Sequence, residues 1–157
     1  MRLPGREFMG IIDDSALWVR DNYGMHHVIA MWMHWSQNIL EPTLGPMIEK
    51  DGFRGMADFW GPSLEAEKAG ARVYYDREQF VLEVSDCPHM RFARENDRPI
   101  PGDFDHCLKC FMLYYPIMRK YGYNMESTVH GQSGYCVLRV TRQKRSAIPA
   151  VDKKLTG

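Results

Sequence analysis

Two cysteines stand three residues apart in the stretch "DFDHCLKC", at Cys107 and Cys110, just after an aspartate and a histidine. The chain has 4 cysteines in its 157 residues, and the other two are Cys87 and Cys136. A Cys-x-x-Cys pair can ligate a metal, form a redox couple, supply a nucleophile or simply pack as small apolar groups. The elements that position these thiols decide between those uses.

Cys107 carries the nucleophile hypothesis. We expect a helix to begin close to it, and the dipole at a helix N-terminus favours a thiolate. A thiolate needs a proton carrier, and His89 and His130 are the candidates from other segments. His106 is a poor partner, because adjacent residues on a helix do not face each other. Asp105 could orient a histidine or act as a general acid–base group.

A zinc site is the alternative use of the thiols, since zinc takes three or four Cys or His ligands. Its candidate ligands are Cys87, His89, Cys107 and Cys110. The chain has a single Cys-x-x-Cys, within an expected helix, whereas strong zinc signatures repeat the motif. We therefore expect no cofactor and keep zinc as the alternative. The hypothesis of a redox pair has less support still, because the sequence pattern lacks the parallel α/β unit that usually carries such a pair.

The N-terminal half reads as helical. Apolar spacing predicts one helix over 7–22 and a longer one over 25–40, which Pro42 should end or kink. Ser63 is expected to cap a further helix that begins at Leu64.

In the second half of the chain, apolar and polar residues alternate, as in β-strands. Residues 71–87 predict a hairpin, and a second hairpin is expected around the glycines of 131–134. Between them lies a helix over 104–121, with Asp103 as its N-cap and Pro116 as a kink. We predict an α+β fold, in which N-terminal helices pack on an antiparallel sheet built from two hairpins flanking a long helix.

No repeat or linker divides the chain. We expect a single domain over 1–157, mainly helical over 1–70, hairpin–helix–hairpin over 71–142, and with a tail over 143–157.

This layout brings three cysteine-bearing segments to a common region: a strand end, a helix start and a strand start. Cys87 raises a difficulty. In a regular strand it points away from the face of Leu82 and Val84, unless a bulge or the Pro88 turn re-aims it.

The aromatic residues of the helices suggest the wall of a pocket for a flat substrate, with the plain core as the competing interpretation. The candidate substrate-binding residues are Trp32, His34, Trp35, Trp60 and Tyr114.

The bulk composition is ordinary for a globular protein, with 45% apolar and 25% charged residues. Basic and acidic residues number 20 each, whereas nucleic-acid-binding domains are usually basic. No apolar run approaches the roughly 20 residues that cross a bilayer, and the N-terminus has no signal-peptide pattern. We expect a cytoplasmic protein with a small-molecule substrate, no nucleic acid and no membrane as partner. Whether the protein forms a homo-oligomer is left open.

Three stretches, "SDCPHM" at 85–90, "GDFDHCLKC" at 102–110 and "HGQSGYCVLRV" at 130–140, resemble the L-2-amino-thiazoline-4-carboxylic acid hydrolase family. The resemblance covers roughly residues 72–142, and Cys87, Cys107 and Cys136 match the family's cysteine positions. The family pattern has an acidic residue where this chain has Cys110. A looser similarity runs to the vinyl-reductase-type domains, which bind small molecules.

The resemblance implies a hydrolase that opens a non-peptide C–N bond in a cyclic amidine or thiazoline-like ring. Cys107 would be the nucleophile, and His89 or His130 would carry the proton. The alternative is a vinyl-reductase-type binding or sensor domain, for a small molecule or a metal, without catalysis. A third hypothesis is a small redox protein that uses Cys107 and Cys110.

Overall fold

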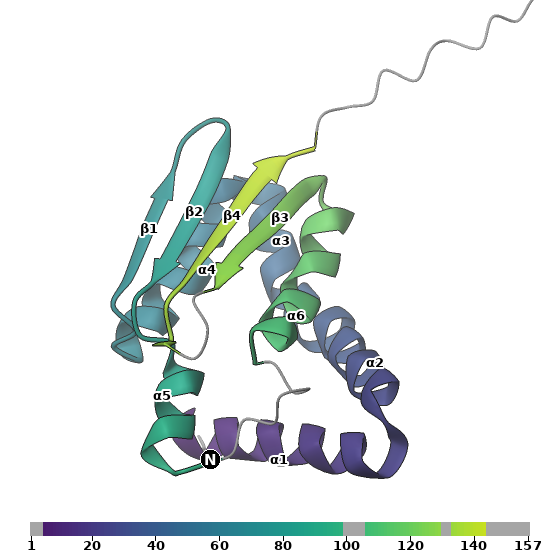
Figure 1. Ribbon diagram of the computed structural model, residues 1–157. Helices are drawn as coiled ribbons and strands as arrows, with labels where there is room; N and C mark the ends of the chain where they lie inside the picture. Colours follow the sequence, from purple (N-terminus) through teal and green to yellow (C-terminus); the bar gives the residue numbers. More distant parts are fainter. Residues whose placement is uncertain (1–4, 99–105, 130–132, 144–157) are drawn as a thin grey trace, which may run out of the picture.

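The computed structural model describes residues 5–98, 106–129 and 133–143, and the side chains of 5–8 and 106 lie outside this description. The elements run in the order α1 (Gly5–Tyr23), α2 (Met25–Trp35), π-helical segment η1 (Ser36–Leu40), α3 (Glu41–Asp51), α4 (Phe53–Ala66), β1 (Ala71–Tyr75), β2 (Gln79–Val84), α5 (Pro88–Glu95), α6 (His106–Lys120), β3 (Tyr123–Val129) and β4 (Cys136–Arg142). The fold is α+β, as predicted, and the N-terminal helices precede an antiparallel sheet (Figure 1).

Both predicted hairpins are present. They join side by side into one four-stranded sheet of order β1-β2-β4-β3 within the described residues. The central contact pairs β2 with β4, strands from different hairpins, in a register that sets Val84 opposite Cys136. The chain that leaves β2 therefore lies beside the chain that enters β4. This brings the Cys87 segment to the Cys136 segment.

The helix predicted over 25–40 is interrupted before Pro42. The α-helix ends at Trp35, continues as the π-helical η1, and resumes as α3 with Pro42 in its first turn. Proline has no N–H to donate and its ring crowds the preceding turn, so a wider π turn accommodates it.

The prediction that Ser63 caps a helix starting at Leu64 is wrong. Ser63 lies inside α4, and its hydroxyl donates to the backbone carbonyls of Phe59 and Trp60. The helix starts at Phe53, eleven residues before Leu64, and follows Gly52 with φ 59°. The serine pattern resembled a cap because serine competes for backbone hydrogen bonds in both settings.

The core lies between the sheet and the helices α3, α4 and α6. Residues of β2 alternate along the strand, and Phe80, Leu82 and Val84 are buried on one face. Trp60 of α4 stacks on Phe80 with ring centroids 5.5 Å apart, and Tyr114 of α6 meets Trp60 edge-on at 5.1 Å. These contacts hold α4 and α6 at fixed positions over the sheet.

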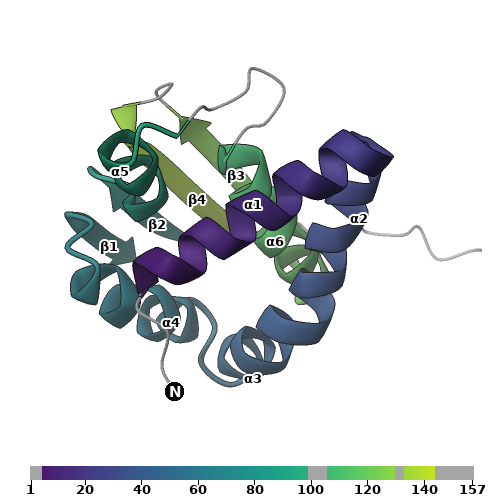
Figure 2. The ribbon, with the colours of Figure 1, turned by 90° about the horizontal axis from the view of Figure 1, so that it is seen from below.

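The first helix lies across one end of the molecule. Figure 2 shows α1 crossing in front of α6 and the sheet, and beside α5. It packs on α2 through a smaller cluster that contains Ala16, Val28 and Trp32, all fully buried. No helix in the described ranges is long and apolar enough to cross a membrane.

Candidate functional site

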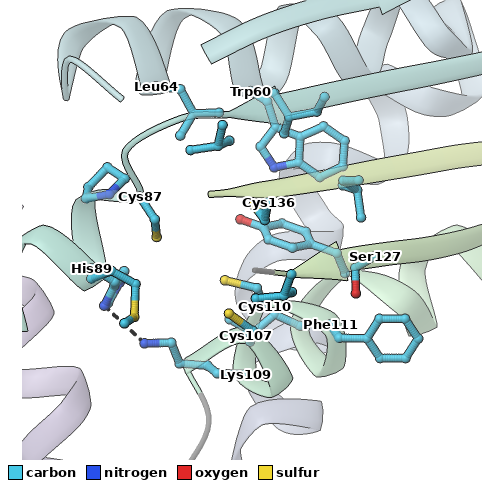
Figure 3. Close-up of a pocket in the computed structure, with 18 of the residues that line it drawn as sticks. Trp60, Leu64, Cys87, His89, Cys107, Lys109, Cys110, Phe111, Ser127 and Cys136 are labelled. Atoms are coloured by element: carbon cyan, nitrogen blue, oxygen red, sulfur yellow. Dashed lines mark hydrogen bonds between the residues drawn. The ribbon is translucent and has the colours of Figure 1, made fainter. Parts of the chain in front are cut away.

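A cavity of about 380 Å³ opens between the sheet and helices α4, α5 and α6, and α1 contributes Met9 and Ile12 to its wall. All four cysteines of the chain line it: Cys87, Cys107, Cys110 and Cys136. None of them is in a disulfide. In Figure 3 the sulfurs of Cys87, Cys107 and Cys110 point toward the same open space. The predicted convergence of three thiol-bearing segments beside a cavity is confirmed.

Cys87 reaches the cavity because the strand stops before it. Strand β2 ends at Val84, and Cys87 occupies the N-cap of α5 ahead of Pro88, with φ −57° and ψ 124°. Its backbone N–H donates to the Gly134 carbonyl at 2.8 Å. The alternation of side-chain directions along β2 therefore does not extend to Cys87. The turn at Pro88 directs the Cys87 thiol into the cavity. Gly134 has φ 83°, and a Cβ on it would lie 3.2 Å from the Cys87 nitrogen, so a side chain there would disturb this contact.

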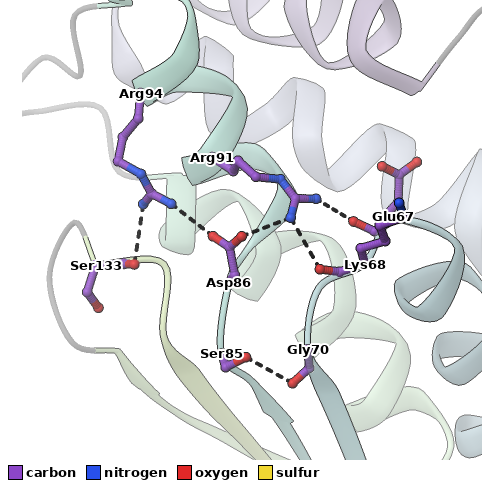
Figure 4. A network of polar contacts seen from close by, with 8 residues as sticks. All are labelled: Glu67, Lys68, Gly70, Ser85, Asp86, Arg91, Arg94 and Ser133. Atoms are coloured by element: carbon purple, nitrogen blue, oxygen red, sulfur yellow. Dashed lines mark hydrogen bonds and ion pairs between the residues drawn. The ribbon is translucent and has the colours of Figure 1, made fainter.

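A surface network holds the same turn in place. The Asp86 carboxylate accepts from Arg91 and from Arg94, each at 2.8 Å (Figure 4). Arg91 also donates to the backbone carbonyls of Glu67 and Lys68, and Arg94 to that of Ser133 at 3.3 Å. The turn that carries Cys87 is thereby tied to the end of α4 and to the entry of β4.

The other three thiols differ in surroundings. Cys107 and Cys110 lie one turn apart in the first half of α6, the former partly buried and the latter exposed. Burial, with the neighbouring Cys87 and Cys110, raises the pKa of the Cys136 thiol to about 11. Cys136 therefore stays protonated near pH 7. The start of α6 is the better place for a thiolate, because backbone N–H groups point toward it.

Lys109, Asp13 and His89 form a cluster of ionisable side chains at one end of the cavity, in which Lys109 and Asp13 are buried and His89 is partly buried. The Lys109 Nζ donates to Asp13 Oδ1 at 3.0 Å, and these side chains are 2% and 4% exposed. The same Nζ lies 3.2 Å from His89 Nδ1 (Figure 3). The second carboxylate oxygen of Asp13 is 3.8 Å from that ring nitrogen. Lys109 and His89 line the cavity, whereas Asp13 stands behind them on α1.

Burial is the main reason that the pKa of His89 lies below its usual value. The Asp13 carboxylate opposes this effect, the charge of Lys109 adds to it, and Glu67 opposes it weakly. The imidazole is therefore neutral at pH 7.

Among the predicted substrate-binding residues, Trp35, Trp60 and Tyr114 line the cavity. Burial raises the pKa of Tyr114 to about 12, so its hydroxyl stays protonated. Trp32 does not line the cavity and belongs to the cluster between α1 and α2. His34 is exposed on α2 and contacts Asn38 on the next turn, away from the cavity.

Two predicted catalytic residues, Asp105 and His130, lie outside the described residues, as does the expected cap Asp103. Of the zinc candidates, Cys87, His89, Cys107 and Cys110 all line the cavity. Within the described ranges, however, no three His, Cys, Asp or Glu side chains are arranged to hold a metal ion. The donors share a cavity without converging on one point.

The sequence interpretation missed Lys109 and Asp13. One signal was available: Asp13 interrupts the apolar run "GIIDDSALWV", and Lys109 stands between two cysteines on the helix. A charge on a core-facing stripe calls for a partner of opposite sign. Nothing in the sequence pairs these two residues, which are 96 positions apart.

No protein-family model matches this chain, and no curated protein matches it. The geometry of the cavity therefore carries the functional interpretation.

Proposed function

We propose that the protein is a hydrolase that opens a non-peptide C–N bond in a small cyclic amidine or thiazoline-like substrate. The observation that carries this proposal is the convergence of Cys87, Cys107, Cys110 and Cys136 on one cavity whose wall also contains His89. The cavity volume of about 380 Å³ suits a small ligand, in the range usual for such pockets. Its aromatic wall supports a flat, partly apolar substrate.

Cys107 is the proposed nucleophile. It sits in the first turn of α6, lines the cavity and is partly buried, whereas the raised pKa of Cys136 keeps that thiol protonated. The Cys107 thiolate adds to the amidine carbon, and the C=N electron pair moves to nitrogen, which takes a proton. The lone pair of the other amidine nitrogen then forms a C=N bond as the C–N bond breaks, and the departing nitrogen keeps the electron pair of that bond and takes a second proton.

His89 is the proposed proton donor to the departing nitrogen, because it shares the cavity with Cys107. Water then attacks the carbon bound to sulfur. The bond between the carbon and the Cys107 sulfur breaks, the Cys107 thiolate leaves with the electron pair, and the two protons released by the attacking water replace the two that the departing nitrogen took. This sequence needs no oxidant and no cofactor.

Turnover of 2-aminothiazoline-4-carboxylate by the purified protein, followed by mass spectrometry, tests the proposal. Cys107→Ala should lower kcat on the order of a thousandfold, since a nucleophile acts as part of one unit. Cys136→Ala, which changes a thiol of the same cavity, is the matched control and should keep most of the turnover. Full turnover by Cys107→Ala would rule out covalent catalysis by this residue.

A second candidate function, a vinyl-reductase-type binding domain without catalysis, is supported by the mainly apolar and aromatic wall of the cavity. Calorimetric titration of the same amidine distinguishes the two. Binding without product in any condition, and no covalent adduct on Cys107, would favour the binding domain.

A further inference from the structure

The contact between Lys109 and His89 constrains where the imidazole holds its proton. The Lys109 Nζ lies 3.2 Å from His89 Nδ1. A lysine ammonium has three N–H donors and no acceptor, so Nδ1 must be the acceptor in this hydrogen bond. A neutral imidazole with an accepting Nδ1 carries its proton on Nε2.

Asp13 would favour the opposite arrangement if it met the histidine alone. Its Oδ2 is 3.8 Å from the same Nδ1, farther than the Lys109 Nζ at 3.2 Å, while its Oδ1 accepts from Lys109 at 3.0 Å. A carboxylate beside a histidine normally accepts from Nδ1–H and favours the imidazolium. Here the ammonium occupies the position between the two and turns Nδ1 into an acceptor.

We propose that Lys109, held by Asp13, is a positioning residue that makes His89 Nδ1 a hydrogen-bond acceptor and so keeps the ring proton on Nε2. His89 then acts as a proton donor toward a substrate in the cavity and does not deprotonate Cys107. The role of His89 as a proton donor rests on the proposed function, whereas the position of the proton on its ring does not. Among the described residues, the charged groups that act on His89 are Asp13 of α1, Lys109 of α6 and, more weakly, Glu67 after α4.

The arrangement gives a balanced proton path. As Nε2 gives its proton to the departing nitrogen, Nδ1 takes one from Lys109, so the ring changes tautomer without becoming an anion. Lys109 is left as a neutral amine beside Asp13 and regains its proton from water. The Cys107 thiolate then owes its stability to the N-terminus of α6, because the neutral Nε2–H ring is no base toward it.

Long-range ¹H–¹⁵N spectra of the full chain with ¹⁵N-labelled histidine read the tautomer directly. The His89→Gln variant assigns the His89 signals by their loss. We expect a non-protonated Nδ1 and a protonated Nε2 at pH 7. A protonated Nδ1, or an imidazolium at that pH, would overturn the proposal.

Two substitutions separate positioning from mere packing. Lys109→Arg keeps a side chain that only donates and should retain the Nε2–H tautomer. Lys109→Met should move the proton to Nδ1, facing Asp13, and raise the titration midpoint of His89; an unchanged tautomer in this variant would contradict the proposed role. Circular dichroism checks that each variant is folded. If the spectra agree with expectation and no amidine is turned over, the hydrolase proposal fails while the assignment of His89 stands.

Discussion

Two clusters of ion pairs flank the cavity, and they differ in how much water reaches them. The inner cluster joins Lys109 to Asp13, with side chains 2% and 4% exposed. The outer cluster joins Asp86 to Arg91 and Arg94, and the Asp86 side chain is 37% exposed. Water screens the outer charges but not the inner ones. The same kind of contact therefore orients a turn at the surface and, in the interior, acts after burial on the pKa of His89.

Removing the inner cation should have the largest effect on stability. Lys109→Met leaves Asp13 buried without its ammonium, and loss of one partner of a buried pair costs about 3–5 kcal/mol. Urea unfolding monitored by tryptophan fluorescence measures the change. Lys120→Met is the matched control, because Lys120 pairs with Glu41 but is 60% exposed. Equal losses in both variants would mean that burial does not distinguish the clusters.

Removing both inner charges should restore most of that loss. Asp13→Leu combined with Lys109→Met fills the site with apolar groups of similar size, and such replacements of buried pairs are often neutral or stabilising. The double variant should therefore be more stable than Lys109→Met in the same urea titration. A double variant as unstable as the sum of the two single variants would show that the charges are not coupled.

The inner cluster should also make stability depend on pH through His89. Because its pKa is lowered in the folded state, the unfolded chain binds the proton more readily. The contribution of His89 is thus fully present above the usual histidine pKa of about 6.5 and is lost as the pH falls below it. Urea unfolding between pH 8 and pH 5 measures the slope. His89→Gln should flatten it, and an unchanged slope in that variant would assign the dependence to other groups.

A substitution in the outer cluster should change the free energy of unfolding least. Asp86→Ala removes contacts to Arg91 and Arg94 that are partly exposed, so we expect a loss below about 1 kcal/mol. The loss should shrink further in 1 M salt, where the screening length is about 3 Å. Asp58→Ala, at the exposed pair with Arg54, is the control. A loss comparable with that of Lys109→Met would show that the turn before α5 depends on these charges for folding.

The strands and helices whose apolar residues follow a regular spacing could be predicted from the sequence. The hairpin over 71–87 and the helix over 104–121 follow from short-range periodicity, and their order implies the α+β fold. The meeting of the thiols followed from that layout. Cys87 was the exception, since its direction depends on the turn at Pro88 and not on strand alternation.

The inner cluster could not be predicted, for a different reason. Asp13 and Lys109 are 96 residues apart, and each alone resembles an ordinary charge on a helix. Likewise Trp32 and Trp35 looked equivalent on one apolar helix, yet Trp35 lines the cavity and Trp32 packs between α1 and α2. The choice between them depends on how α1 crosses α2, which pairwise packing decides and local pattern does not.

The position of α1 has a consequence for any shortened form of the chain. This helix joins the rest of the fold through Gly24, with φ 89°, and it provides the only carboxylate bonded to Lys109 among the described contacts. A form that lacked residues 5–23 would lose Met9 and Ile12 from the wall of the cavity and leave the Lys109 ammonium without the Asp13 carboxylate. Deletion of the first helix would therefore change the charge that a ligand meets, in addition to removing part of the wall.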